Sequence, residues 1–123
     1  MAYLDYSKKI DNILLKDKRY RKEAYNFVLN ALNHTISKLP KPRHITGREL
    51  LEGIKDFGIS QFGPMVFEVF EHWGIETTDD FGEIVFNLIE QGLLSKTETD
   101  SKDDFKDVFD LKDTFKKEFK FIL

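Results

Sequence analysis

The sequence predicts a single domain of the α+β class, mainly helical, with about five to six helices and one C-terminal β-hairpin. Apolar residues recur every three or four positions over most of the chain, which is the period of an α-helix. Glycines and prolines separate these stretches where helices are expected to start and end. Towards the end of the chain, two short apolar runs flank a polar loop, which is the pattern of a hairpin.

Two helices are predicted before the first proline. A short amphipathic helix spans 5–16, and a longer one spans 21–38, where the apolar positions keep the helical rhythm for about four turns. Pro40 and Pro42 then end the second helix, because proline lacks a backbone donor and restricts the residue before it.

A third and a fourth helix follow the prolines. The third is predicted over 46–60, where Thr46 is placed to cap the N-terminus and Glu49 completes a capping box. The fourth is predicted over 64–73, with a proline in its first turn. It lies in the apolar run QFGPMVFEVFEHWGI, residues 61–75, and its apolar positions cover two sides of the helix. We interpret this run as the centre of the core, and a ligand pocket is the alternative.

The fifth predicted helix spans 78–91 and is bounded by glycines. Gly74 suits the left-handed end of the preceding helix, and either Thr77 or Thr78 caps the new one. Gly92 then closes the fifth helix.

The C-terminal part of the chain predicts the hairpin and a last short helix. The two strands are 93–97 and 105–109, and the polar loop 98–104 joins them. The last helix is predicted over 111–119, where three apolar residues are spaced by fours.

Three successive helices followed by a hairpin is also the order of elements in winged-helix domains. The helix 78–91 would then be the recognition helix, and 97–105 would be the wing. Nucleic-acid binding needs Lys or Arg on the elements that meet the phosphates. The helix 78–91 carries neither, and the region 78–104 is acidic, which disfavours nucleic acid. A winged-helix nucleic-acid-binding protein is therefore the alternative function, and it would have to use its basic N-terminal half.

Length and composition indicate a soluble globular protein without cysteine chemistry. Of the 123 residues, 41% are hydrophobic and 33% are charged, which is enough for one core. The absence of Cys excludes disulfides, thiolate metal sites and thiol nucleophiles, and it suits a reducing compartment. No stretch resembles a signal-peptide core or reaches the ~18 apolar residues of a membrane span. We therefore expect a cytoplasmic protein with no targeting segment and no membrane contact.

Charge is distributed unevenly along the chain. Residues 1–48 carry 11 Lys or Arg against 4 Asp or Glu, whereas residues 74–113 carry 4 against 12. This separation either steers partners or reflects two regions that face each other within the fold, and we favour the second interpretation.

Four phrases of the sequence resemble a small uncharacterised bacterial family, largely restricted to planctomycetes, verrucomicrobia and their relatives. The phrases are AYNFVLNAL, HITGRELLEGI, FGPMVFEVFEHWGI and DFGEIVFNLIEQGLLSKTETDSKDDFKDVFD. The resemblance spans roughly Tyr20 to Phe115 and implies no activity, ligand or catalytic residue, because no function is known for that family. On this basis the single domain, 1–123, consists of an N-terminal helical appendage (1–20), a family core (21–115) and a tail (116–123).

No set of residue types in the sequence predicts catalysis, a cofactor or a metal site. A Ser-His-Asp order, a phosphate-binding glycine loop and an HExxH stretch are all absent. Glu68 and His72 are four residues apart and would supply two metal ligands, but two are too few. We interpret them as an exposed pair near the end of a helix. We therefore predict no enzyme, no cofactor and no metal.

The residues predicted to meet a partner are a basic cluster before the third helix and one aromatic residue, Phe86. The cluster comprises Lys38, Lys41, Arg43, His44 and Arg48. It suits an acidic partner surface or a bound anion, and a solvated loop with no role is the alternative. Phe86 points away from the apolar stripe of its helix, so either the hairpin and tail cover it or it meets a partner.

The leading functional hypothesis is a small, non-catalytic, cytoplasmic protein-interaction module. Its partner is an unknown protein, and we expect a monomer or a weak dimer. This hypothesis depends on the absence of catalytic residue types and on the predicted partner surface, because no motif names an activity.

Overall fold

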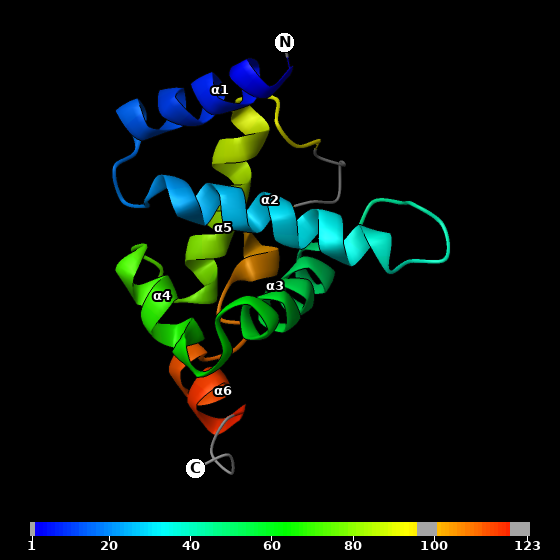
Figure 1. Cartoon of the computed structure of the whole chain (residues 1–123), viewed down its shortest axis with the longest axis vertical. Helices are drawn as coiled ribbons and strands as arrows, with labels where there is room; N and C mark the ends of the chain where they lie inside the picture. Colours follow the sequence, from blue (N-terminus) through cyan, green and yellow to red (C-terminus); the bar gives the residue numbers. More distant parts are fainter. Residues whose placement is uncertain (1, 96–100, 119–123) are drawn as a thin grey trace.

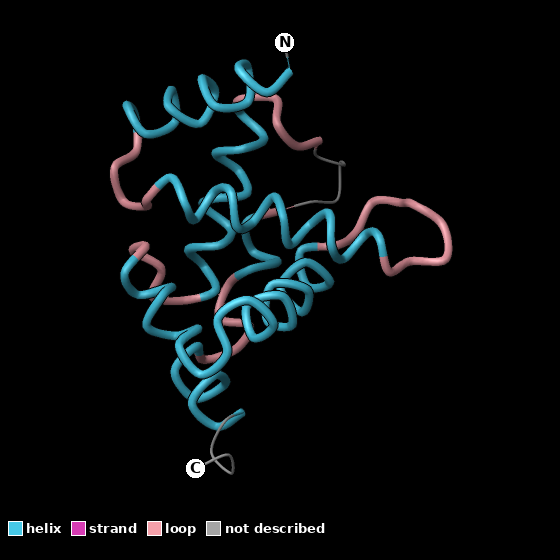
Figure 2. The backbone as a smooth tube through the Cα atoms, in the orientation of Figure 1, coloured by secondary structure: helices cyan, strands magenta, loops and turns pink. Residues whose placement is uncertain are grey.

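The computed structural model describes residues 2–95 and 101–118 of the chain. In these residues every regular element is a helix, as the tube in Figure 2 shows. The α-helices are α1 (Ala2–Lys16), α2 (Lys22–Ser37), α3 (Gly47–Phe62), α4 (Val66–His72), α5 (Thr78–Glu90) and α6 (Leu111–Glu118). Two short 3-10 helices are η1 (Gly63–Met65) and η2 (Lys102–Phe105).

The helices are stacked along the long axis of the molecule, with α1 at one end and α6 at the other (Figure 1). Helix α2 crosses the middle and packs against α3 and α5. Helix α4 lies beside α3 and α6, while η2 fills the space between α3 and α5. None of the helices in the described ranges is long and apolar enough to span a bilayer.

The predicted helix boundaries are confirmed where capping residues specify them. Thr46 and Glu49 form the predicted capping box, with the Glu49 amide donating to Thr46 Oγ1 at 3.1 Å. Gly74 has φ +92°, and the amide of Ile75 donates to the Phe70 carbonyl at 2.9 Å, as in a Schellman helix end. The fourth helix differs slightly from the prediction, because its proline lies in the 3-10 turn η1 and α4 starts only after it.

The predicted core run is buried at its centre and partly exposed at its start. Phe70 is fully buried, and its ring centre lies 5.3 Å from that of Phe27 on α2 and 5.3 Å from that of Phe81 on α5. The ring of Phe115 on α6 lies 5.5 Å away. One side chain of α4 therefore contacts three other helices. Met65, by contrast, is 56% exposed.

The prediction of a C-terminal β-hairpin, and with it the α+β class, is wrong. Residues 93–95 and 101–109 form no strand, and the remainder of the predicted hairpin, 96–100, lies outside the described residues. Ser101 and Asp104 instead form a capping box that starts η2, with the Asp103 amide donating to Ser101 Oγ at 3.1 Å. Asp107 has φ +49°, which is incompatible with an extended strand.

Two backbone donors of the predicted second strand are bound by side chains of α5 rather than by a neighbouring strand. The Asp107 amide donates to Asp79 Oδ1 at 2.9 Å, and the Val108 amide donates to Thr78 Oγ1 at 3.0 Å. These side chains at the start of α5 replace the ladder that a hairpin would supply. Without strands, the described part of the chain has no wing, so the winged-helix arrangement is also wrong.

Phe105 takes the place of the hairpin in the packing. It is 3% exposed, and it lies against glycines of α3 and α5. A Cβ added at Gly82 would lie 3.0 Å from Phe105 Cβ, and one added at Gly47 would lie 3.0 Å from the Phe105 ring. These two helices can approach η2 so closely because neither has a side chain at the contact.

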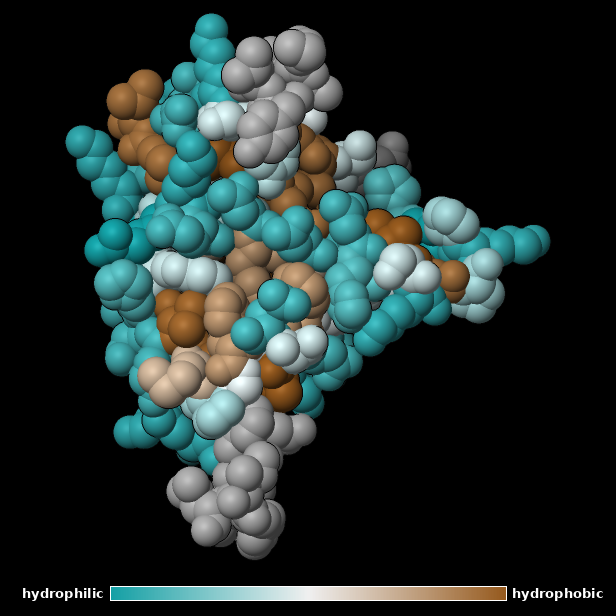
Figure 3. All heavy atoms as spheres, viewed as in Figure 1, coloured by the Kyte–Doolittle hydropathy of each residue, from teal (hydrophilic) through white to brown (hydrophobic). Residues whose placement is uncertain are grey.

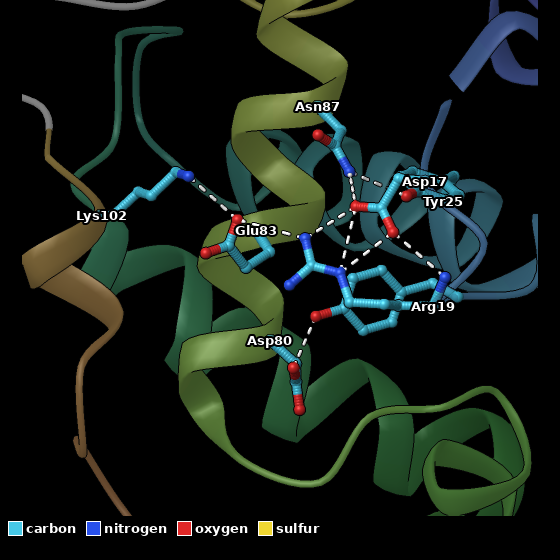
Figure 4. A network of polar contacts seen from close by, with 8 residues as sticks. Asp17, Arg19, Tyr25, Asp80, Glu83, Asn87 and Lys102 are labelled. Atoms are coloured by element: carbon cyan, nitrogen blue, oxygen red, sulfur yellow. Dashed lines mark hydrogen bonds and ion pairs between the residues drawn. The ribbon is translucent and has the colours of Figure 1, made fainter. Parts of the chain in front are cut away.

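A network of polar contacts joins the α1–α2 loop to α5 (Figure 4). Asp17 accepts hydrogen bonds from Arg19 Nη2 at 2.7 Å and from Asn87 Nδ2 at 3.0 Å. The same Asn87 amide donates to Tyr25 Oη at 3.0 Å. The hydrogen bonds from Arg19 hold the pKa of Asp17 well below its usual range, although partial burial opposes this effect.

The loop is also anchored to the first two turns of α5. Tyr20 Oη donates to Asp80 Oδ1 at 2.5 Å, and burial, assisted by this carboxylate, raises the pKa of Tyr20. Glu83 Oε2 forms ion pairs with Arg19 Nη2 at 3.4 Å and with Lys102 Nζ at 2.9 Å (Figure 4). The network therefore ties the N-terminal helices and η2 to the same face of α5.

Truncation of Phe70 should destabilise the protein strongly. We expect Phe70→Ala to lower the free energy of unfolding by about 3–5 kcal/mol, because it leaves a cavity between four helices. The exposed Met65→Ala should change it by no more than about 0.5 kcal/mol. Urea denaturation of both variants tests this, and similar losses in the two would contradict the assignment of the core.

The contribution of Asp17 to the free energy of unfolding should disappear in acid. We expect Asp17→Asn to lower the free energy of unfolding at pH 7 by about 1–2 kcal/mol, discounted for the exposure of Arg19. The folded-state pKa of Asp17 is depressed, so this difference should shrink as the pH falls below the ordinary carboxyl pKa of about 4.

Denaturation at a series of pH values from 7 down to 2.5 measures the difference. The exposed Asp11, which has a single 3.4 Å contact with Lys22, provides Asp11→Asn as a control with little effect. A loss for Asp17→Asn that stayed constant down to pH 2.5 would show that Asp17 acts without its charge.

Candidate partner-binding cleft

The main cavity of the described structure is an open cleft of about 470 Å³. It lies between the C-terminal half of α2, the start of α3, the second half of α5 and η2. We call it the α2–α5 cleft. The residues that line it are Leu32, Ile36, Pro42, Arg43, His44, Ile45, Thr46, Gly47, Leu50, Val85, Phe86, Ile89, Leu93, Leu94, Ser95, Ser101, Asp104 and Phe105.

The walls of the α2–α5 cleft are apolar because α2 and α5 carry apolar residues that face the cleft, in addition to those that face the core. On α5, Ile84 and Leu88 are fully buried in the core, whereas Phe86 and Ile89 are only partly buried and line the cleft. Leu93 continues this wall past the end of α5, where its amide donates to the Leu88 carbonyl at 3.0 Å. In the described residues, the apolar lining of the cleft thus continues the core.

One rim of the cleft is the α2–α3 loop, residues 38–46, which projects from the helices at the right of Figure 1. Arg43 fixes this loop to α3, since its Nη1 donates to the His44 carbonyl at 2.9 Å and its Nη2 donates to Glu49 Oε2 at 2.8 Å. Glu49 also accepts from the Thr46 amide at 2.9 Å. The same carboxylate therefore caps α3 and holds the loop.

This arrangement stabilises the ionised form of Glu49. The hydrogen bond from Arg43, followed by that from the Thr46 amide, lowers the pKa of Glu49 to about 2. The pKa of Arg43 is raised by the same contact. Both groups are therefore ionised at neutral pH, and Arg43 is already matched by a carboxylate.

The structure brings together part of the partner surface predicted from the sequence. Arg43, His44 and Phe86 line the same cleft, although 43 and 86 are far apart along the chain. Lys38 and Lys41 are exposed on the rim loop, and so is Arg48 in the first turn of α3, but none of these three lines the cleft.

The sequence predicted that the hairpin and the tail cover Phe86. The hairpin does not form in the described residues, and α6 packs against α4. Residues 96–100 of the predicted hairpin and 119–123 of the tail lie outside the described residues. The half-buried Phe86 lies in the wall of the cleft, and Phe105 of η2 lines the same cavity.

Sequence reasoning missed the η2 side of the cleft, where Ser101, Asp104 and Phe105 lie. A signal for it was present, because Ser101 and Asp104 have the Ser-x-x-Asp spacing of a capping box. The hairpin prediction placed these residues in a loop and a strand, and so their common turn was not recognised.

A smaller hollow of about 200 Å³ lies on another side of α2. It is lined by Phe27, Phe57, Phe62, Trp73, Glu23, Asn26, Asn30 and Gln61. Apolar side chains also gather near the middle of the face drawn in Figure 3. The rings of this hollow pack on each other, with the centres of Phe27 and Trp73 5.5 Å apart, and the volume of the hollow is less than half that of the α2–α5 cleft.

The predicted Glu68–His72 pair is not brought together with a third ligand. Glu68 is bound by Lys116 of α6, which lowers its pKa, and His72 is exposed. Over residues 2–95 and 101–118, no group of three or more His, Asp or Glu is placed to hold a metal ion.

In the described residues, a single ion pair joins the basic region 1–48 to the acidic region 74–113. In this pair, Arg19 lies 3.4 Å from Glu83, and no other described ion pair joins 1–48 to 74–113. Ion pairing between the two regions is therefore limited, and most of the basic residues of the α2–α3 loop remain available to a partner.

The described residues thus define a small helical protein in which an apolar cleft lies beside a basic loop. Comparison with protein-family models, with curated proteins and with solved structures finds no match for this chain. The resemblance to the bacterial family accordingly stays a prediction.

Removal of Arg43 should raise the pKa of Glu49. We expect the pKa of Glu49 to rise from about 2 towards the usual value of 4.5 in Arg43→Ala, because its strongest hydrogen-bond donor is lost. Carboxyl-detected NMR titration measures this directly. Since the folded-state pKa is depressed, the attachment of the loop should be complete near pH 7 and should weaken as the pH falls from about 4.5 towards 2.

Arg48→Ala is the matched control, because Arg48 is one residue from Glu49 and no described ion pair includes it. In Arg48→Ala, the pKa of Glu49 should remain near its value in the unmodified protein. A Glu49 pKa that is ordinary already in the unmodified protein would show that the loop is not held by this ion pair.

Proposed function

We propose that this chain is a small protein-interaction module of the cytoplasm that works without catalysis, and that the α2–α5 cleft is its docking site. A monomer or weak dimer is sufficient for this role. The observation that carries the proposal is the combination of an open apolar cleft with a basic rim whose charges are mostly unmatched.

The polar groups of the cleft favour a docking role over catalysis. Arg43 is bonded to Glu49, and Thr46, Ser101 and Asp104 are used in helix caps. A small-molecule or catalytic site needs convergent polar groups that are free to bind and act on a substrate. Here four of the polar residues that line the cleft serve the fold, and the rest of the lining is mainly apolar, as at Ile89 and Leu94.

The charges around the cleft favour a protein over a nucleic acid. The α2–α3 loop is basic, but η2 carries Asp103 and Asp104, and Glu90 is exposed at the end of α5. Phosphates approaching the cleft would meet these carboxylates. A protein partner can match both signs of charge, because its own surface can carry both.

A charge placed in the cleft should abolish partner binding without unfolding the protein. We expect Phe86→Glu to lose the proteins that the unmodified chain captures from a lysate of its source organism, because an apolar docking wall would become charged. Quantitative mass spectrometry of the captured proteins measures the loss, and far-ultraviolet circular dichroism checks the fold.

Two matched controls place the same new charge on exposed apolar residues outside the cleft. Leu15 is 76% exposed on α1, and Met65 is 56% exposed in η1, and neither lines the cleft. Leu15→Glu and Met65→Glu should capture the same proteins as the unmodified chain. Equal capture by all four proteins would overturn the assignment of the cleft, and loss in Met65→Glu alone would move the site to α4.

A further inference from the structure

We infer that the α2–α5 cleft selects an acidic segment of its partner: a few bulky apolar side chains enter the cleft, and flanking carboxylates lie over Lys38, Lys41 and Arg48. This inference rests on the proposed function and adds the chemistry of the partner. It is carried by the size of the cleft and by the distribution of charge on its two rims.

The size of the cleft fits a few side chains rather than a folded surface or a long ligand. An engineered cavity of about 150 Å³ lined by Leu, Ile and Phe holds one benzene molecule. At about 470 Å³, the α2–α5 cleft has room for about three groups of that size. Apolar residues on one face of a short helix, at positions i, i+3, i+4 and i+7, present side chains in such numbers.

The basic rim carries charge that the fold does not use. Among residues 2–95 and 101–118, no ion pair includes Lys38, Lys41 or Arg48, and all three are exposed. Arg43, in contrast, is neutralised by Glu49 at 2.8 Å. Three unmatched positive charges therefore border one side of the apolar cleft, where they attract carboxylates and repel a basic segment.

The η2 side of the cleft carries acidic side chains and meets the start of α3, where a Cβ added at Gly47 would lie 2.9 Å from Asp104 Cβ. Asp104 is used in the cap of η2, where its Oδ2 accepts from the Ser101 amide at 3.2 Å. Carboxylates of the partner are therefore expected along the α2–α3 loop and not along η2. Lys102 does not offset this, because it is paired with Glu83 at 2.9 Å.

Three fluorescent peptides of 14 residues separate charge from apolar contact. The acidic peptide has Phe at positions 3 and 10, Leu at positions 6, 7 and 11, and Glu or Asp elsewhere. The second peptide keeps the apolar residues but replaces every acidic residue by Lys, and the third keeps the acidic residues but replaces the apolar ones by Ser. Fluorescence anisotropy measures binding, and amide NMR shifts of the labelled protein show where each peptide binds.

We expect the acidic apolar peptide to bind at the cleft and to bind at least about tenfold more tightly than either control peptide. Raising the salt concentration should weaken this binding, since exposed charges are screened. The triple variant Lys38→Glu, Lys41→Glu, Arg48→Glu should weaken it about tenfold, whereas Phe86→Glu should abolish it.

A second triple variant, Lys8→Glu, Lys16→Glu, Lys18→Glu, controls for net charge. These lysines are exposed, no described ion pair includes them, and none lines the cleft. This variant changes the net charge by the same amount as Lys38→Glu, Lys41→Glu, Arg48→Glu. Unchanged peptide binding by this variant would therefore show that the position of the charge matters.

The outcomes distinguish this inference from the proposed function. Equal binding of the acidic and the Lys peptide at the cleft would overturn the acidic partner while leaving the cleft as a docking site. Shifts confined to residues outside the cleft, or no binding of any peptide, would overturn the inference, and the capture experiment would then decide the proposed function on its own. Displacement of the acidic peptide by a 14-base-pair DNA duplex that binds more tightly would overturn it in favour of nucleic acid.

Discussion

The contact between Phe27 and Phe70 is the constraint on which the other helices depend. Their ring centres are 5.3 Å apart, and Phe70 also meets Phe81 and Phe115, so α2, α4, α5 and α6 share one aromatic centre. Aromatic rings at this spacing contribute through both buried area and their edge-to-face geometry. Because α4 has only seven residues, it cannot hold its place by its own hydrogen bonds, and this packing fixes it.

The cleft follows from how η2 is held at a distance from α2. Phe105 is fixed against Gly47 of α3 and Gly82 of α5, which draws η2 onto those two helices. The C-terminal half of α2 does not pack on η2 in this way, and Ile36 of α2 and Phe86 of α5 both line the cleft. The proposed binding surface is thus a gap in the core that arises from two glycines and one phenylalanine.

The helices could be predicted because their signals are local. Thr46 with Glu49, and Gly74 and Gly92, mark helix ends through hydrogen bonds that span only a few residues. The structure near Phe105 could not be predicted in this way, because its apolar spacing suits a strand as well as a turn. What decides between them is distant in sequence: the amides of Asp107 and Val108 donate to side chains of α5, and only the folded chain brings these groups together. The same holds for the cleft, whose basic rim was visible in the sequence but whose apolar walls come from α2 and α5.

Hydrogen–deuterium exchange of the chain with and without a captured partner tests the central claim most directly, since it reports on every part of the backbone at once. The claim is that the partner covers the open gap between α2, α5 and the basic loop. We expect slower exchange on binding at 38–48 and 85–94, with α1 unchanged. Protection confined to α1, or to α4 and α6, would place the partner on a different surface and contradict the claim.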